Sequence, residues 1–175
     1  MPKNGKRRWT TKSISFKNLG RGWLKTYHLV KQQYHAKVKR GPNGEVQSYR
    51  VRIVAGGHRQ VEGINYTETF YAAAKMPTVC VVLANAAHQD WEIEHVDVKS
   101  AYLNAPLRET IYMKPPRGVL KPGEEGKVLR LLKGLYGLKQ AGRGWYLEMT
   151  RVFLKELDFK RSAIDHSMYF RHKGE

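Results

Sequence analysis

Residues 33–55 read QYHAKVKRGPNGEVQSYRVRIVA, and this stretch predicts two antiparallel strands joined by a tight turn. Asn43 and Gly44 give the strongest local hairpin signal, because both residue types tolerate positive φ. In the second strand the period of two places Arg50 and Arg52 together on one face, and three apolar side chains on the other. The sequence therefore predicts a basic hairpin near the front of the chain.

The rest of the chain alternates helical and strand patterns. Residues 77–89 are rich in Ala, Leu and Val after a proline that suits a first helical turn. Residues 145–157 carry an apolar stripe at helical spacing. Strands are expected over 91–98, 109–116, 127–132 and 167–173. These patterns predict an α/β or α+β domain from residue 31 to residue 175, preceded by a poorly ordered basic arm at residues 1–30.

The predicted strand 91–98 ends in a candidate chemical group. Asp97 closes an apolar-alternating run and opens a turn rich in small residues. Strand ends of α/β folds are common places for functional side chains. The alternative for a lone aspartate at this position is a turn or N-cap residue. The neighbouring pair Asp165 and His166 also suggests metal ligands, but adjacent residues rarely ligate one ion, so a turn or cap role is favoured there.

The charge of the chain favours a polyanionic partner. The net charge is +17, and residues 1–44 hold twelve Lys or Arg and no acidic residue. Residues 45–175 contribute only +5. A field of this sign attracts nucleic acid through its phosphates. For residues 1–30 themselves, a solvated tail or a nuclear-import patch at Lys6–Arg8 is the favoured interpretation.

The cysteine content and hydropathy indicate an intracellular protein, either cytoplasmic or nuclear. Cys80 is the one cysteine, which excludes an intrachain disulfide and a Cys-based zinc site. No apolar run approaches the roughly 20 residues of a membrane span. The N-terminus is basic but has no apolar region of the secretory type. We therefore expect no membrane partner.

Four blocks of sequence resemble one known family. In chain order they are YRVRIVAGGHRQVEGINYTETF, DWEIEHVDVKSAYLNAPLRETIYMKPP, LLKGLYGLKQAGRGWY and RSAIDHSMYF. Together they resemble the reverse transcriptase of copia-type retrotransposons, from about Gln33 to about Arg171. The resemblance implies an α+β right-hand polymerase, with a fingers hairpin followed by an incomplete palm sheet flanked by helices.

The resemblance also implies roles for individual residues. Asp97 would be the catalytic aspartate that binds Mg²⁺ through its carboxylate, with Val98 binding through its carbonyl. The aromatic ring of Tyr102 would exclude a ribose 2′-hydroxyl, with a core tyrosine as the alternative. The expected nucleotide-binding residues are Arg50 or Arg52, Ser100, Ala101, Tyr102 and Gly137. The expected nucleic-acid-binding residues are Lys37, Lys39, Arg40, Lys139 and Arg143.

Several departures from the family pattern bear on activity. The family carries two further metal-binding carboxylates as adjacent aspartates, and no Asp-Asp pair occurs in these 175 residues. We therefore expect a magnesium site that is incomplete, a chain that is inactive alone, and self-association through an open palm edge. Gly57, Cys80 and Gly142 also stand where the family has Lys, Arg and Pro.

The implied activity is RNA-directed DNA polymerisation, with an RNA template, a DNA primer and deoxynucleoside triphosphates as partners. The alternatives are a non-catalytic basic nucleic-acid-binding module and the product of a relic gene. Both alternatives share the basic charge, so the charge alone does not separate them.

Overall fold

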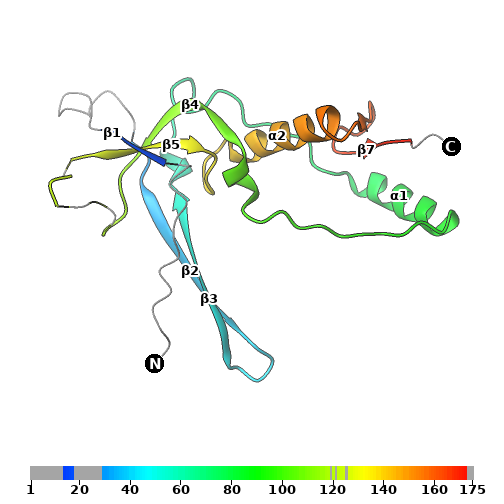
Figure 1. Cartoon of the computed structure of the whole chain (residues 1–175), viewed down its shortest axis with the longest axis horizontal. Helices are drawn as coiled ribbons and strands as arrows, with labels where there is room; N and C mark the ends of the chain where they lie inside the picture. The colour runs from blue at the N-terminus through cyan, green and yellow to red at the C-terminus, as the bar shows by residue number, and fades with distance from the viewer. Residues whose placement is uncertain (1–13, 18–28, 119, 121, 125, 173–175) are drawn as a thin grey trace.

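The computed structural model describes residues 14–17, 29–118, 120, 122–124 and 126–172. Within these residues the chain is a mixed α/β protein with three small antiparallel sheets and two α-helices. The largest sheet has the order β1 (Ile14–Lys17), β5 (Val128–Lys133) and β4 (Pro106–Met113). Figure 1 shows this sheet lying at the junction between a long hairpin and α2 (Ala141–Lys155).

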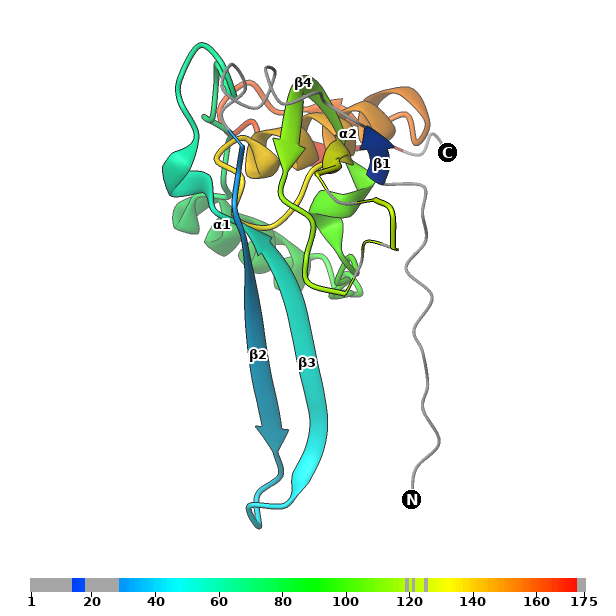
Figure 2. The ribbon, with the colours of Figure 1, turned by 90° about the vertical axis from the view of Figure 1, so that its left-hand side faces the viewer.

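The predicted hairpin is confirmed. β2 (Gln32–Arg40) and β3 (Val46–Ala55) pair antiparallel along their whole length, from Gln32 opposite Ala55 to Arg40 opposite Val46. The turn uses Gly44 at a φ of +82°, a left-handed conformation that favours glycine. The hairpin projects from the body of the molecule, as Figures 1 and 2 show.

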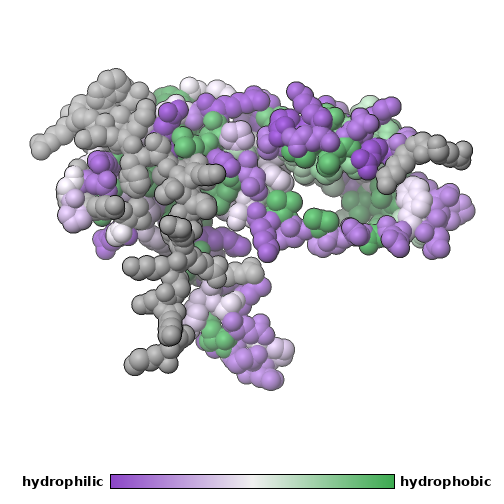
Figure 3. Space-filling view, in the orientation of Figure 1, coloured by the Kyte–Doolittle hydropathy of each residue, from purple (hydrophilic) through white to green (hydrophobic). Residues whose placement is uncertain are grey.

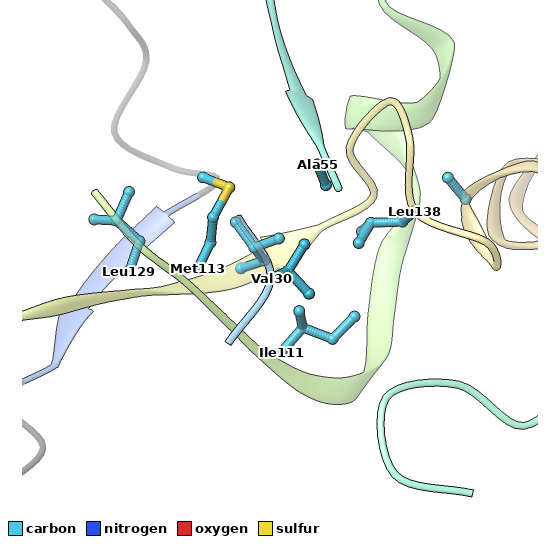
Figure 4. Close-up of a cluster of buried hydrophobic side chains, with 8 residues drawn as sticks. Val30, Ala55, Ile111, Met113, Leu129 and Leu138 are labelled. Atoms are coloured by element: carbon cyan, nitrogen blue, oxygen red, sulfur yellow. The ribbon is translucent and has the colours of Figure 1, made fainter. Parts of the chain in front are cut away.

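The hydrophobic core lies where the hairpin meets the largest sheet. The side chains drawn in Figure 4 come from β3, β4, β5, the start of α2 and the segments just before β2 and α2. Its buried members are Val30, Ala55, Ile111, Met113, Leu129, Leu131, Leu138 and Ala141. Because Ala55 ends the second hairpin strand, this cluster fixes the base of the hairpin to the sheet.

The two predicted helices are confirmed, and they differ in burial. α1 (Met76–His88) has Pro77 in its first turn, as expected, but buries only Ala86. α2 buries four residues along one side: Ala141, Gly142, Tyr146 and Thr150. A short pair, β6 (Lys160–Arg161) with β7 (Tyr169–Phe170), follows α2. No helix in the described part of the chain has the length and apolar character to cross a membrane.

The predicted strand at 91–98 is wrong. Residues 91–98 form an extended connection from α1 toward η4 (Ala101–Asn104), and every residue from Asp90 to Ser100 is exposed. A strand is held by hydrogen bonds to a neighbouring strand, and none of the described strands pairs with this segment. Alternating polarity alone therefore gave the wrong element here.

Two further expectations at the chain ends need correction. Ile14–Lys17 is a strand paired with β5, so part of the expected arm belongs to the sheet. Val30 is fully buried in the core and donates its N–H to the Tyr112 carbonyl at 3.0 Å. Residues 1–13 and 18–28 lie outside the described residues. The strand expected at 167–173 is reduced to Tyr169–Phe170, because its partner β6 has only two residues.

Apolar side chains remain exposed on α1 and on the extended connection. Among them are Val81 at 61% exposure, Ile93 at 64% and Val96 at 75%. In Figure 3, hydrophobic surface shows between α2 and α1 at the end of the molecule away from the hairpin. Large exposed apolar patches mark interaction sites or aggregation-prone surfaces on soluble proteins.

Candidate nucleotide and nucleic-acid site

Asp97 and Val98 lie on the exposed connection just before η4. Val98 is 45% exposed, and Asp97 is also exposed. Ser100 follows in the left-handed region at a φ of +55°, and its carbonyl accepts a hydrogen bond from the Leu103 N–H at 2.8 Å. This turn reverses the chain and starts η4, so Ser100 and Ala101 occupy a tight turn next to Asp97.

The donor groups at this place do not make a complete metal site. Within the described residues, no three His, Cys, Asp or Glu side chains come together in a way that would hold a metal ion. Asp97 contributes one carboxylate and Val98 one carbonyl. Mg²⁺ prefers a full octahedron of oxygen ligands, so most of its ligands would have to come from substrate, water or other protein groups.

Tyr102 and Arg52 are brought together by a third residue. The rings of Tyr102 and Tyr136 lie 4.7 Å apart between centroids. The guanidinium of Arg52 lies over the other ring, 5.7 Å from the centroid of Tyr136. Burial raises the pKa of Tyr102, with smaller contributions from Tyr71 and Tyr136. Tyr102 also packs against the core cluster, which agrees with the core alternative for this tyrosine.

Arg50 and Arg52 differ in position along β3. The backbone of Arg50 pairs with Lys37, and Arg52 pairs with His35, nearer to the base of the hairpin. The side chain of Arg50 lies outside the described part of the structure. The contact between Arg52 and Tyr136 connects the hairpin to the loop before α2. Tyr136 was not among the sequence candidates, although its aromatic ring between two glycines was a usable signal.

Gly137 is required by the packing of two backbones. It adopts a φ of +88°, and a Cβ at this position would overlap the carbonyl oxygen of Ala55. The Ala55 N–H donates to the Tyr136 carbonyl at 2.7 Å. Gly57 faces the same loop, and its Cβ would overlap the Gly137 carbonyl. Hence the backbone of Gly137 lies close to the backbone at the base of the hairpin. Glycine is needed at position 57 because a side chain there would overlap the Gly137 carbonyl.

Gly142 also has a contact that a larger residue would disturb. A Cβ there would lie 2.5 Å from the ring of Tyr71. Gly142 is in the first turn of α2, where proline is otherwise tolerated. A residue with a Cβ at this position would need the Tyr71 ring, which is 44% exposed, to shift.

The expected nucleic-acid-binding residues fall into two groups. Lys37, Lys39 and Arg40 are exposed on the hairpin, and Arg40 also donates to the Gly44 carbonyl at 2.9 Å. Near α2, Lys139 is exposed and donates to the Tyr66 hydroxyl at 3.1 Å.

Arg143 differs from Lys139 in that its charge is already paired. It forms an ion pair with Glu68 at 2.5 Å and donates to the Phe70 carbonyl at 2.8 Å. Arg143 thus holds the 67–70 segment against α2. A cavity of about 300 Å³ lies beside this ion pair, between α2 and the start of β4, and Asp97 and Tyr102 are not among its lining residues.

Asp165 has a cap role, as the sequence favoured. Its side chain is buried and accepts hydrogen bonds from the Ser167 N–H at 2.9 Å and the Lys75 N–H at 3.1 Å. Hydrogen bonds from the hydroxyls of Ser167 and Thr78, and from these two N–H groups, hold the pKa of Asp165 well below its ordinary value. Lys75 is the N-cap residue of α1 and makes no side-chain cap of its own. Asp165 therefore caps α1 from a segment ninety residues away.

Comparison with known proteins gives one family over most of the chain. The family described as reverse transcriptase (RNA-dependent DNA polymerase) matches residues 25–175. The chain is 36% identical over 146 residues to the retrovirus-related Pol polyprotein from transposon TNT 1-94 of Nicotiana tabacum, a match that covers 83% of the chain and 11% of the relative. It is also 36% identical over 137 residues to the retrovirus-related Pol polyprotein from transposon RE1 of Arabidopsis thaliana, a match that covers 78% of the chain and 9% of the relative.

A more distant relative supports the same assignment. The transposon Ty1-NL2 Gag-Pol polyprotein of Saccharomyces cerevisiae is 30% identical over 118 residues, covering 65% of the chain and 6% of the relative. The chain thus spans about a tenth or less of the length of the curated relatives that it matches. No solved structure shows a significant match. On the family match and these identities, the chain belongs to the reverse transcriptase (RNA-dependent DNA polymerase) family of copia-type retrotransposons.

Proposed function

We propose that this chain supplies the fingers hairpin and the first palm residues of an RNA-directed DNA polymerase. One observation carries the proposal: Arg52 from the hairpin, Tyr102 after Asp97, and Tyr136 before α2 meet within ring-contact distance. These three residues come from three separate sequence blocks that resemble the family. A nucleotide-binding site built from several segments requires such a meeting point.

The proposed roles follow from the chemistry of each group. Arg52, which lies nearer to the base of the hairpin and contacts Tyr136, binds the triphosphate of the incoming nucleotide through its planar fork, which matches phosphate oxygens. The Tyr102 ring limits the space at the sugar. The backbone N–H groups of Ser100 and Ala101 are available in a tight turn, a geometry that suits phosphate. Asp97 and Val98 would hold Mg²⁺, which offsets phosphate charge when bound.

The incomplete set of carboxylates limits what the chain does by itself. Two-ion phosphoryl transfer needs carboxylates that hold both ions, and this sequence has no adjacent aspartates to join Asp97. We expect no RNA-templated primer extension by the 175-residue chain with either Mg²⁺ or Mn²⁺. Reproducible extension that an Asp97→Asn variant lacks would contradict this expectation.

Non-catalytic binding of nucleic acid is the second candidate function. The net charge of +17 and the exposed lysines of the hairpin favour it. It needs no metal, so it does not depend on the incomplete site at Asp97. The two candidates share the hairpin surface and differ in whether Asp97 binds a divalent ion.

Paramagnetic broadening by Mn²⁺ separates the two candidates. Mn²⁺ added to the chain with a primed RNA template and a deoxynucleoside triphosphate should broaden the amide signals of residues 97–102. Asp97→Asn should abolish the broadening and leave binding of the primed template unchanged. Broadening that is absent, or that persists in Asp97→Asn, would leave only the non-catalytic binding function.

A further inference from the structure

The buried amide side chains of Gln60 and Gln140 connect the loop after the hairpin to the loop before α2. Gln60, Asn65 and Gln140 are each exposed by 5% or less. The Gln60 Nε2 group donates to Gln140 Oε1 at 2.9 Å, across eighty residues of sequence. Gln140 Nε2 in turn donates to the main-chain carbonyl of Asn65 at 2.7 Å. Buried amides that satisfy one another in this way hold their backbones in a single arrangement.

This network ends on the main chain of Lys139. The Lys139 N–H donates to Gln60 Oε1 at 2.7 Å, so Gln60 uses its acceptor for Lys139 and its donor for Gln140. The bond is partly buried, so losing the acceptor would leave the Lys139 N–H partly shielded from water without a partner, which costs free energy. Gln60 is therefore the hydrogen-bond partner of the Lys139 backbone in this arrangement.

A second contact from the same loop holds the Lys139 side chain. Its ammonium lies 4.6 Å from the centroid of the Tyr66 ring and donates to the Tyr66 hydroxyl at 3.1 Å. An ammonium has three donors, and no carboxylate in the described residues forms an ion pair with Lys139. In contrast, the nearby Arg143 is paired with Glu68. Lys139 thus presents an unneutralised charge from a fixed position.

The residues that contact Lys139 belong to the sequence GGHRQVEGINY, residues 56–66. Neither the hydrophobic core nor the proposed nucleotide contacts accounts for Gln60 and Tyr66 in this stretch. We propose that residues 57–66 form a support loop that presents Lys139 to a nucleic-acid phosphate, with Gln60 as its positioning residue. The proposal rests on the proposed nucleic-acid binding and adds a residue that does not itself touch the ligand. Tyr66 orients the charge, and Gln60 fixes the backbone that carries it.

A double-mutant cycle on the full chain tests the role of Gln60. The probe is a single-stranded oligo(U) RNA, titrated by fluorescence anisotropy at several salt concentrations. Removing one phosphate contact from a single strand lowers the salt slope by about 0.7, which is about fivefold in affinity at 0.1 M salt. Lys139→Ala should show this loss. Gln60→Met, which removes the acceptor at similar side-chain volume, should show most of it.

The coupling between the two positions decides the proposal. In the Gln60→Met background, Lys139→Ala should cause little further loss, because the lysine is already misplaced. The control is Lys37→Ala on the hairpin, whose loss should be the same with and without Gln60→Met. Full additivity of Gln60→Met and Lys139→Ala would overturn the positioning role, as would equal coupling of Gln60→Met to Lys37→Ala. A wild-type chain without salt-dependent RNA binding would instead overturn the proposed nucleic-acid binding, and the positioning role with it.

A conservative variant keeps the test valid if Gln60→Met fails to fold. Gln60→Glu keeps an acceptor for the Lys139 N–H but loses the donor to Gln140. Lys139→Ala should therefore still cost about fivefold in the Gln60→Glu background. If Lys139→Ala has no effect there, while circular dichroism shows a folded protein, the bond between Gln60 and Lys139 is not what positions the lysine.

Discussion

Two glycines allow the hairpin base and the loop before α2 to touch through their main chains. Gly57 and Gly137 each leave a space that the other segment's backbone fills. The Ala55 N–H bond to Tyr136 lies beside this contact. Consequently, the position of Arg52 over the Tyr136 ring depends on glycine at positions 57 and 137.

Gly137→Ala tests this backbone contact. The new Cβ combines a positive φ with an overlap on the Ala55 carbonyl oxygen. Gly63→Ala is the matched control, because Gly63 has a φ of +78° and open space around its Cβ. We expect a loss of about 1–2 kcal/mol for Gly63→Ala from the left-handed conformation alone, and a clearly larger loss for Gly137→Ala. Urea unfolding measures both, and equal losses would show that the contact with Ala55 relaxes at no cost.

At the scale of elements, α1 depends on a cap from a distant segment. It buries only Ala86, so packing contributes little to its stability. Helices in water are marginal at this length without tertiary support. The carboxylate of Asp165 accepts the N–H of the N-cap residue Lys75 and lies at the positive end of the helix dipole. The segment 162–168 and α1 should therefore unfold together.

Asp165→Asn should weaken folding in a pH-dependent way. Because the folded-state pKa of Asp165 is depressed, its contribution is fully present above the unfolded pKa of about 3.9 and is lost as the pH falls below that value. The stability difference between wild type and Asp165→Asn should thus be largest at neutral pH and shrink below about pH 4. Urea midpoints across this range measure it.

The control is the same substitution at the exposed Asp97. At neutral pH, Asp97→Asn should leave the urea midpoint of unfolding close to that of wild type, because Asp97 is exposed. If Asp165→Asn gives the same unfolding curve as wild type at neutral pH, the carboxylate does not cap α1. Amide exchange in the first turn of α1 gives a second measure of the cap.

For the whole molecule, the basic charge predicts salt-sensitive and sequence-independent binding of nucleic acid. Each phosphate neutralised should add roughly −0.7 to −0.9 to the slope of log affinity against log salt. Binding to RNA and to duplex DNA should therefore fall steeply as salt rises. A shallow slope, or tight binding to one sequence only, would count against this prediction.

The structure changes which truncation can test the basic N-terminal segment. Deletion of residues 1–30 would remove β1 and the buried Val30, so it would damage the sheet as well as the charge. Deletion of residues 1–13 removes five basic residues and leaves β1 intact. This shorter deletion should lower affinity while the melting temperature stays unchanged.

The exposed apolar side chains of α1 and the connection predict self-association. Replacing Ile93 and Val96 with threonine should lower light scattering at high protein concentration, because less apolar surface is left to be buried between molecules. The control is Val51→Thr, at an apolar position on the hairpin that is 58% exposed. A wild-type chain that is monomeric at all concentrations would contradict the prediction. An equal effect of Val51→Thr would place the association elsewhere.

The sequence by itself determined the features that depend on local signals. The Asn43-Gly44 turn and the alternation of β2 and β3 specify the hairpin without help from the rest of the chain. The helical stripe at 145–157 and Pro77 located α2 and α1 to within a few residues. The four family blocks carried the family assignment, since motif order is a property of the sequence.

Tertiary structure decided the features that depend on contacts between distant segments of the chain. Residues 91–98 alternate like a strand, yet they remain exposed and unpaired within the described chain, because alternation cannot supply a neighbouring strand. Ile14–Lys17 has a weak local pattern, yet it is a strand because β5 lies beside it. The contact of Arg52 with Tyr136, and the bond of Gln60 with Lys139, join segments about eighty residues apart. Such contacts are set by chain packing, which no local pattern in the sequence encodes.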